Sequence, residues 1–362
     1  MRSTAARATL LAAAAATMIA CGGDGDGAYC RELAITDAKA CDRLTTFGLF
    51  TGDPREQKPA SDVVPYAPAA TLFSDYALKY RFVYLPPGER AKYSEGPLDF
   101  PVGTIVAKTF AFAKDHREPD KDRKLIETRL LIKQASGWIL RPYVWNDEQT
   151  EALLARVGAR TNVSFIGPDG QPRDTPYVVP NENQCKECHE DANTDIVLIG
   201  LAGRHINSDY AYAGGAKNQL AYWIEHDLID GAPEPAKAAA LPGWEDTTQS
   251  LETRARAWLD VNCAHCHGPS GSARNTGLDL RASQQDTFKF GVCKTPVAAG
   301  GGSGGRKYNI VPGKPDESIL VFRIESLTAD EMMPEVGRQL RHEEGIKLVR
   351  DWISGLAGSC AN

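Results

Sequence analysis

The sequence predicts an α+β chain of several domains, in which an N-terminal antiparallel β sandwich or barrel-like domain precedes an all-α domain. Three observations lead to this prediction. Between residues 66 and 180, β-branched and aromatic runs alternate with turn signals. After about residue 247, apolar residues recur at helical spacing instead. The chain of 362 residues, with 42% hydrophobic and 24% charged side chains, can form two or three cores and is too apolar for a disordered protein.

Residues 1–20 are predicted to be a signal peptide. Two arginines precede an apolar, Ala-rich run that is too short to span a bilayer once the leader is cleaved. The run ends in Met18-Ile19-Ala20-Cys21, which resembles a bacterial lipobox with Met18 where leucine is usual. In that case Cys21 is lipidated; an ordinary secretory signal is the alternative. Either reading predicts an exported protein in the periplasm or at the cell surface, which contacts the membrane through a lipid anchor only.

Residues 21–65 are expected to form a tether and an N-terminal arm, and residues 66–180 the β-rich domain. Four strands are expected in that domain, over 78–85, 104–113, 125–133 and 138–145. Pro86-Pro87-Gly88 ends the first of them, and Ser136-Gly137 is typical of a hairpin turn. A short helix is expected over 147–156.

Residues 247–362 are expected to form the all-α domain, and residues 181–246 a segment that connects it to the β domain. Thr247 or Thr248 can cap a first helix that runs to about Val261. The last helix, over 342–356, places four apolar residues on one face: Ile346, Val349, Ile353 and Leu356.

The motif CxxCH occurs twice, at Cys185-Lys186-Glu187-Cys188-His189 and at Cys263-Ala264-His265-Cys266-His267. In such a motif the two thiols add across the vinyl groups of a haem, and the histidine binds its iron as proximal ligand. We therefore expect two covalently bound haem c groups, attached through Cys185 and Cys188 and through Cys263 and Cys266, with His189 and His267 as iron ligands.

Three other readings of the CxxC pairs remain open. Zinc sites also use such pairs, but they do not require a histidine directly after each one. A thioredoxin-like redox motif would need a βαβ unit, which the pattern does not contain. A structural disulfide is the third alternative.

The remaining cysteines suggest two disulfides. Of nine cysteines, Cys21 and the two CxxC pairs account for five, and an even remainder in an exported protein favours pairing. Cys30–Cys41 is the local pair, and Cys293–Cys360 follows by elimination. Other connectivities stay open.

The distal iron ligands are less constrained. Met332 and Met333 precede Pro334 and the last helix, where a distal thioether for the second haem is expected, and we favour Met333. For the first haem His205 is the leading candidate; His226, another residue or an open iron site are the alternatives. Two histidine ligands would give that haem a lower potential than a His/Met haem.

Residues from Leu251 to Asn362 resemble a class I cytochrome c domain. The matching stretches are residues 258–268, around the second CxxCH, residues 311–318, and Met332-Met333-Pro334. The resemblance implies an all-α fold with a helix before the motif and a closing helix after the distal ligand.

The wider chain, from about residue 45, resembles a family of predicted dihaem c-type cytochrome lipoproteins, often annotated beside parallel-β-helix lipoproteins. The stretches that carry this resemblance are residues 72–76 (LFSDY), 100–104 (FPVGT), 127–131 (ETRLL), 145–146 (WN) and 183–184 (NQ). The resemblance implies dihaem electron transfer and names no substrate.

These observations predict an exported dihaem c-type cytochrome that carries electrons between periplasmic or surface redox partners. A dihaem peroxidase-like enzyme with an open first haem is one alternative, and a haem-bearing surface binding module is another. Electron transfer is favoured over catalysis, and no catalytic residue is assigned. The net charge of −6 argues against a nucleic-acid partner.

Overall fold

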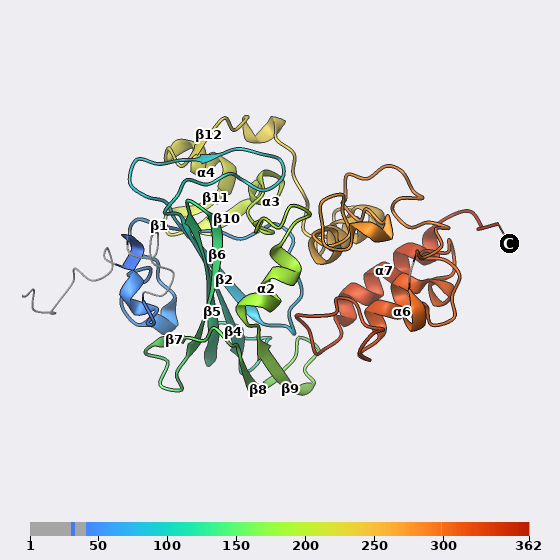
Figure 1. Ribbon diagram of the computed structural model, residues 1–362, viewed down its shortest axis with the longest axis horizontal. Helices are drawn as coiled ribbons and strands as arrows, with labels where there is room; N and C mark the ends of the chain where they lie inside the picture. The colour runs from blue at the N-terminus through green and yellow to red at the C-terminus, as the bar shows by residue number, and fades with distance from the viewer. Residues whose placement is uncertain (1–29, 33–40, 298, 362) are drawn as a thin grey trace, which may run out of the picture.

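The computed structural model describes residues 30–32, 41–297 and 299–361. The expected signal peptide and the lipidation site Cys21 lie outside these residues. The largest element is an antiparallel six-stranded sheet (Figure 1). In spatial order its strands are β1 (Val63–Pro65), β2 (Leu78–Tyr84), β4 (Ile105–Ala113), β5 (Arg123–Gln134), β6 (Gly137–Trp145) and β7 (Ala152–Leu154).

Three two-stranded ladders accompany the sheet. They pair β8 (Ala159–Ile166) with β9 (Pro172–Val179), β10 (Asp209–Tyr212) with β11 (Gly215–Asn218), and β3 (Ala91–Lys92) with β12 (Ile229–Asp230). The α-helices are α2 (Glu182–His189), α3 (Gly203–Ile206), α4 (Gln219–Glu225), α5 (Leu251–Leu259), α6 (Ile319–Glu325) and α7 (Glu343–Gly355). A π-helical turn, Asp260–Ala264, follows α5 directly.

Two parts of the predicted fold class are wrong. The β-rich region is one open six-stranded sheet with a separate β8–β9 hairpin, and not a sandwich or a barrel. The C-terminal region is not an all-α cytochrome c domain: α5, α6 and α7 have 9, 7 and 13 residues, and long irregular loops connect them. Only 23% of the structure is helical. The reason is local, because the Gly- and Pro-rich stretch between the second CxxCH and α6 cannot extend a helix.

Two smaller expectations also need correction. The stretch 147–156 forms a turn and the short strand β7 (Ala152–Leu154) instead of a helix, because the chain turns back there to pair with β6. The first C-terminal helix is capped by Ser250, whose side chain accepts the N–H of Thr253 at 3.1 Å, and not by Thr247 or Thr248.

Both faces of the sheet are buried. Successive residues on its strands point to opposite sides, and each of the two sets belongs to an apolar core. One face packs against the N-terminal arm, through residues such as Phe47 and Leu49. The other packs against the segment after the first CxxCH. That segment contributes Leu198, Leu201, Ile206, Leu220 and Trp223. Short helices and loops therefore take the place of a second sheet.

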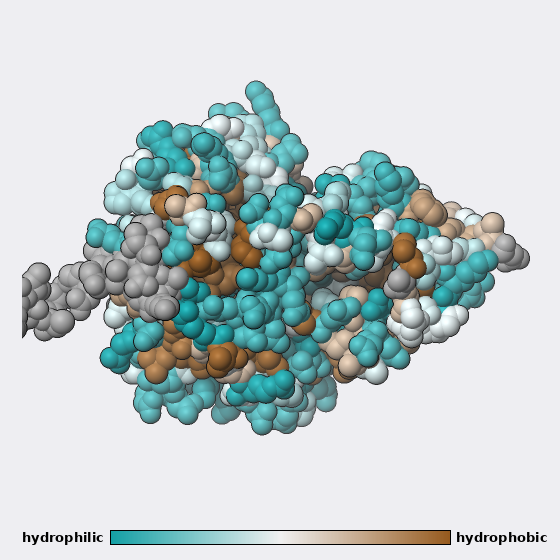
Figure 2. Space-filling view, viewed as in Figure 1, coloured by the Kyte–Doolittle hydropathy of each residue, from teal (hydrophilic) through white to brown (hydrophobic). Residues whose placement is uncertain are grey.

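The C-terminal region has its own apolar core, around Trp258, Phe290, Val349 and Trp352. In Figure 1, helix α2 lies between the sheet and this region. The face shown in Figure 2 is mainly hydrophilic, with apolar patches over the β-rich part. Within the part of the chain that the structure describes, no helix is long and apolar enough to cross a membrane.

The C-terminal region is held to the sheet by contacts around His342, at the start of α7. Its ring stacks on Phe73 with 4.4 Å between the centroids. The indole N–H of Trp258 donates to His342 Nδ1 at 2.9 Å. Nearby, the hydroxyl of Tyr76 donates to Glu344 at 2.9 Å. This junction connects residues more than 250 positions apart in sequence.

Two disulfides are present, Cys30–Cys41 and Cys293–Cys360. These are the pairs that the cysteine count favours. The first ties the N-terminal arm together, and the second joins the loop before α6 to the C-terminus. The four CxxCH cysteines are free thiols.

The His342 junction predicts a pH dependence of stability. Burial, with the nearby charge of Lys79, lowers the pKa of His342 to about 3, whereas an unfolded histidine titrates near pH ~6.5. Between these values the unfolded chain binds more protons, so folding stability falls as the pH drops from ~6.5 towards 3. His342→Gln removes one such group, and the slope of unfolding free energy against pH, from urea titrations, should decrease by up to about 1.4 kcal/mol per pH unit.

His226→Gln is the matched control, because the side chain of His226 is exposed. It should leave the slope unchanged. Equal slopes for wild type and His342→Gln would show that the junction does not exclude a proton from this ring.

Candidate cofactor-binding site

The first CxxCH lies on helix α2, whose start is fixed by a capping box. Asn181 Oδ1 accepts the N–H of Gln184 at 2.8 Å, and Gln184 Oε1 accepts the N–H of Asn181 at 3.1 Å. An ion pair of 2.9 Å between Glu182 and Arg141 ties the helix to β6. The motif therefore begins on a fixed helix with Cys185 buried against the sheet.

The second CxxCH lies where α5 widens into the π-helical turn. Wide turns of this kind often occur at functional sites. Asp260 and Asn262 anchor the turn: Asp260 accepts the N–H of Ala282 at 2.9 Å, and Asn262 Oδ1 accepts the N–H of Phe73 at 2.8 Å. The turn is thus held both to its own region and to the chain before β2.

The two motifs, far apart in sequence, lie side by side. The N–H of Ala192 donates to the carbonyl of Ser270 at 2.8 Å, and the Ser272 hydroxyl donates to the carbonyl of Glu187 at 3.3 Å. The thiols of Cys188 and Cys266 interact, which raises the pKa of Cys188 and lowers that of Cys266. The structure therefore brings together the two segments that were expected to bind separate cofactors.

The histidine of each motif is oriented by a hydrogen bond to its Nδ1. His189 Nδ1 lies 2.8 Å from the carbonyl oxygen of Val197, which can only accept. His267 Nδ1 lies 3.1 Å from Thr276 Oγ1, and that hydroxyl donates its own proton to the carbonyl of Ala273 at 2.7 Å. Both Nδ1 atoms therefore carry the proton, and the Nε2 lone pair is left for another partner.

Both rings are neutral near pH 7. Burial lowers the pKa of His189 to about 4, and burial also lowers the pKa of His267. A neutral imidazole whose Nδ1–H is bound to an oxygen is the form in which histidine binds a metal through Nε2.

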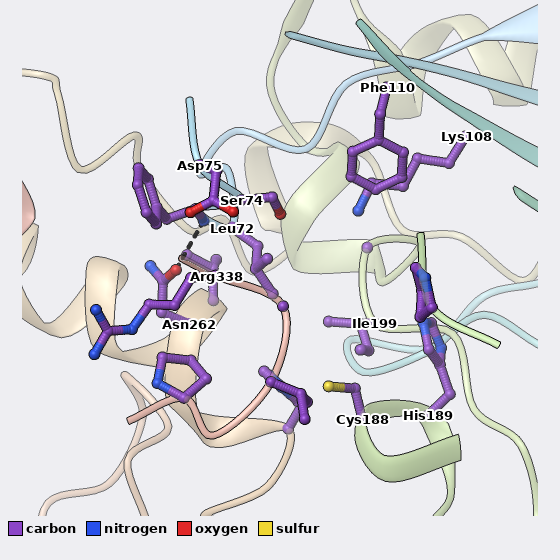
Figure 3. A pocket seen from close by; sticks show the side chains of 18 of the residues that line it. Leu72, Ser74, Asp75, Lys108, Phe110, Cys188, His189, Ile199, Asn262 and Arg338 are labelled. Atoms are coloured by element: carbon purple, nitrogen blue, oxygen red, sulfur yellow. Dashed lines mark hydrogen bonds between the residues drawn. The ribbon is translucent and has the colours of Figure 1, made fainter. Parts of the chain in front are cut away.

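A cavity of about 350 Å³ lies between the sheet, α2 and the C-terminal region. Figure 3 shows Cys188 and His189 on one side of it, Lys108 and Phe110 from the sheet, and Asn262 and Arg338 from the C-terminal region. A volume of this order suits an organic cofactor. Of the predicted site residues, Cys185, Cys188, His189, His205 and Met333 line the cavity. The second motif contributes His265, whereas Cys263, Cys266 and His267 lie outside the lining.

His205 is 2% exposed and lines the cavity with His189. Neither ring nitrogen has a hydrogen-bond partner in the described chain, and Nε2 lies 3.7 Å from Asp260 Oδ1. Burial alone would raise the pKa of Asp260, but His205 and the 3.0 Å ion pair with Arg204 lower it to about 2. His226, the alternative, is exposed, bonded to the Tyr222 carbonyl, and away from the cavity.

Met333 also lines the cavity, and Met332 does not. The N–H of Met333 donates to the carbonyl of Arg323 at 2.9 Å. The charge of Arg323 contributes, after burial, to the lowered pKa of His267. Arg323 thus lies close to both the methionine and the histidine that were expected to hold the second haem.

The residues present fit a covalently bound haem at the first motif. Two free thiols, an oriented neutral histidine and a second buried histidine, which has no hydrogen bond to either ring nitrogen, border one cavity. Apolar side chains such as Val106 and Leu131 complete its wall. Among the described residues, no group of three or more His, Cys, Asp or Glu side chains is arranged to hold a metal ion by itself.

Several residues of this site carry no signal in the sequence. The backbone carbonyl of Val197 and the hydroxyl of Thr276 acquire their roles only through their positions in the fold. Asp260 and His342 have the appearance of ordinary helix residues in the sequence. Cations from three strands, Arg81, Lys108 and Arg129, also line the cavity; strand register could have linked them, had the strand order been known. No family model, curated protein or solved structure matches this chain.

Proposed function

We propose that this protein is an exported dihaem c-type cytochrome that carries electrons between redox partners. The first haem is attached through Cys185 and Cys188 with His189 as proximal ligand. The second is attached through Cys263 and Cys266 with His267 as proximal ligand. The haem iron supplies a one-electron redox couple when bound.

One observation carries the proposal. Both motif histidines donate Nδ1–H to an oxygen, at 2.8 and 3.1 Å, and so turn Nε2 outward as a lone pair. A haem-binding histidine needs this arrangement, because the Nδ1 bond fixes both the tautomer and the ring orientation. A disulfide or a thioredoxin-like CxxC has no use for it. Its repetition at two unrelated sequence positions supports haem binding at both.

In this function the protein positions the two haems. The capping box on α2 and the anchored π-helical turn fix the thiols of the two motifs. The second motif lies against the first, with Cys266 Sγ 3.9 Å from the carbonyl oxygen of Glu187, and this contact would bring the two haems close together, which favours direct transfer between them.

The distal side favours electron transfer over catalysis at an open iron. His205 is buried on the cavity wall with no hydrogen bond to either nitrogen, so it is available as a sixth ligand. We assign it to the first haem and Met333 to the second. Two histidines give a lower potential than histidine with methionine, so the pair would pass electrons from the first haem to the second.

In this proposal the cellular location of the protein follows from the predicted signal peptide and the predicted lipidation site, Cys21. The protein would be lipid-anchored in the periplasm or at the cell surface, where cofactor attachment to CxxCH and disulfide formation both take place. Its partner would be a periplasmic or surface redox protein.

Removal of each CxxC pair tests the two attachment sites. Wild-type protein, exported from a host that matures c-type cytochromes, should carry two haems per chain by pyridine haemochrome and intact mass. Cys185→Ala with Cys188→Ala should carry one, and so should Cys263→Ala with Cys266→Ala, because thioether bonds cannot form without the thiols.

Cys30→Ala with Cys41→Ala is the matched control, since it removes a cysteine pair of a different role. It should keep two haems. Wild-type protein with no covalent haem, or with a stoichiometric zinc ion instead, would refute the proposal.

The Met333 assignment has its own test. Ferric haem with a methionine ligand has a weak charge-transfer band at the red edge of the visible spectrum. Met333→Ala should abolish this band, and Met332→Ala should retain it, because the N–H of Met333 is bonded to Arg323, whose charge acts on His267. Loss of the band in Met332→Ala alone would transfer the ligand to that residue.

A further inference from the structure

We infer that three cations on the buried sheet face, Arg81, Lys108 and Arg129, form a binding site for a carboxylate-bearing ligand in the cavity. We call these three residues the cationic row. All three line the cavity.

The cationic row follows from strand register. Arg81 of β2 lies directly opposite Lys108 of β4, and Lys108 lies directly opposite Arg129 of β5. Directly opposite residues on one sheet face are the closest cross-strand neighbours. The next row along the same face is wholly apolar, with Val83, Val106 and Leu131 in register. The cationic row therefore has an apolar row on one side, and on its other side Lys79, Phe110 and Glu127 lie in register on the same face.

Two of these cations have no acidic partner. Within the described residues, neither Arg81 nor Lys108 forms an ion pair, although Arg81 is only 6% exposed. Lys108 Nζ lies 4.7 Å from the centre of the Phe110 ring, and Figure 3 shows its side chain directed into the cavity.

The nearest carboxylate, Glu127, is already occupied. It accepts two hydrogen bonds from Arg129, at 2.5 and 2.7 Å, and one from the Tyr177 hydroxyl at 2.6 Å. Glu127 therefore balances Arg129, and two positive charges remain uncompensated.

Such a row is costly unless an anion neutralises it. Like charges directly opposite each other destabilise a sheet, and a buried charge needs a partner. Burial, and then the charges of Arg81 and the other cations, lowers the pKa of Lys108 well below its usual range. An anion among these groups would remove both penalties.

The chemistry points to carboxylates. Guanidinium groups bind carboxylates through paired hydrogen bonds, and an ammonium group adds a point charge. The row faces the cavity that also contains His189, whose pKa is lowered, after burial, partly by Lys108 and Arg129. The carboxylates can come from two sources. One is the pair of propionates of a haem at the first motif, and this source rests on the proposed function. The other is a dissociable dicarboxylate, which is independent of the proposed function.

A substitution of Lys108 tests the row through the sign of its effect. If an anion occupies the row, Lys108→Met in the haem-loaded protein removes a charge-assisted contact and should lower the thermal unfolding midpoint. If the row holds no anion, the same change relieves repulsion and should raise the midpoint. Lys124→Met is the matched control, because Lys124 is a half-exposed lysine of β5 in a surface ion pair, and it should shift the midpoint little.

Two further measurements identify the source. Succinate, compared with sodium chloride at equal ionic strength, should raise the midpoint of wild type if the ligand is dissociable, and Lys108→Met should weaken this binding about tenfold or more. If propionates occupy the row, succinate has no effect, and Lys108→Met lowers the reduction potential of one haem, because loss of a nearby positive charge favours ferric iron.

Two results together overturn the proposal. Lys108→Met raises the unfolding midpoint or leaves it unchanged, and neither the succinate titration nor the haem potentials show a response. Haem content is measured separately on every sample. A protein without haem would refute the proposed function, and the succinate titration would still decide whether the row binds carboxylates.

Discussion

The structure depends on one constraint: a six-stranded sheet that is buried on both faces has no second sheet to cover it. Each face must be buried by other chain. The N-terminal arm covers one face, and the segment after the first CxxCH covers the other through residues such as Trp223 and Leu201. The first CxxCH is therefore part of the cover of the sheet and is positioned by it.

The same constraint brings the two motifs together. The cover leaves a cavity over the cationic row and over Val106 and Leu131 of the neighbouring apolar row. Helix α2 borders this cavity, and the C-terminal region closes it from the other side, held by the stacking of Phe73 on His342 and by the ion pair of Arg204 with Asp260. Sheet burial, the contact between the motifs and the charged wall thus have a common origin.

Features set by local spacing could be predicted from the sequence: the two CxxCH motifs, the Cys30–Cys41 disulfide, four of the strands and helix α7. The Cys293–Cys360 pair followed from the count of the remaining cysteines. Features set by tertiary placement could not. Lys79 and Arg81 alternate with apolar residues in β2, which is typical of a solvated face, yet that face is covered. The prediction of an all-α C-terminal domain was wrong because two amphipathic helices do not determine the structure of the chain between them. The hydrogen bonds of His189 and His267 to Val197 and Thr276 could be identified only from the fold.

The proposed function requires that two haems are bound and that a protein ligand caps each iron. EPR of the oxidised, haem-loaded protein, followed by addition of carbon monoxide to the reduced form, tests it most directly. We expect two low-spin haems and no carbon monoxide binding, because His205 and Met333 would occupy the sixth positions. A high-spin signal, with carbon monoxide bound to one haem, would contradict it and would favour an enzyme with an open iron site.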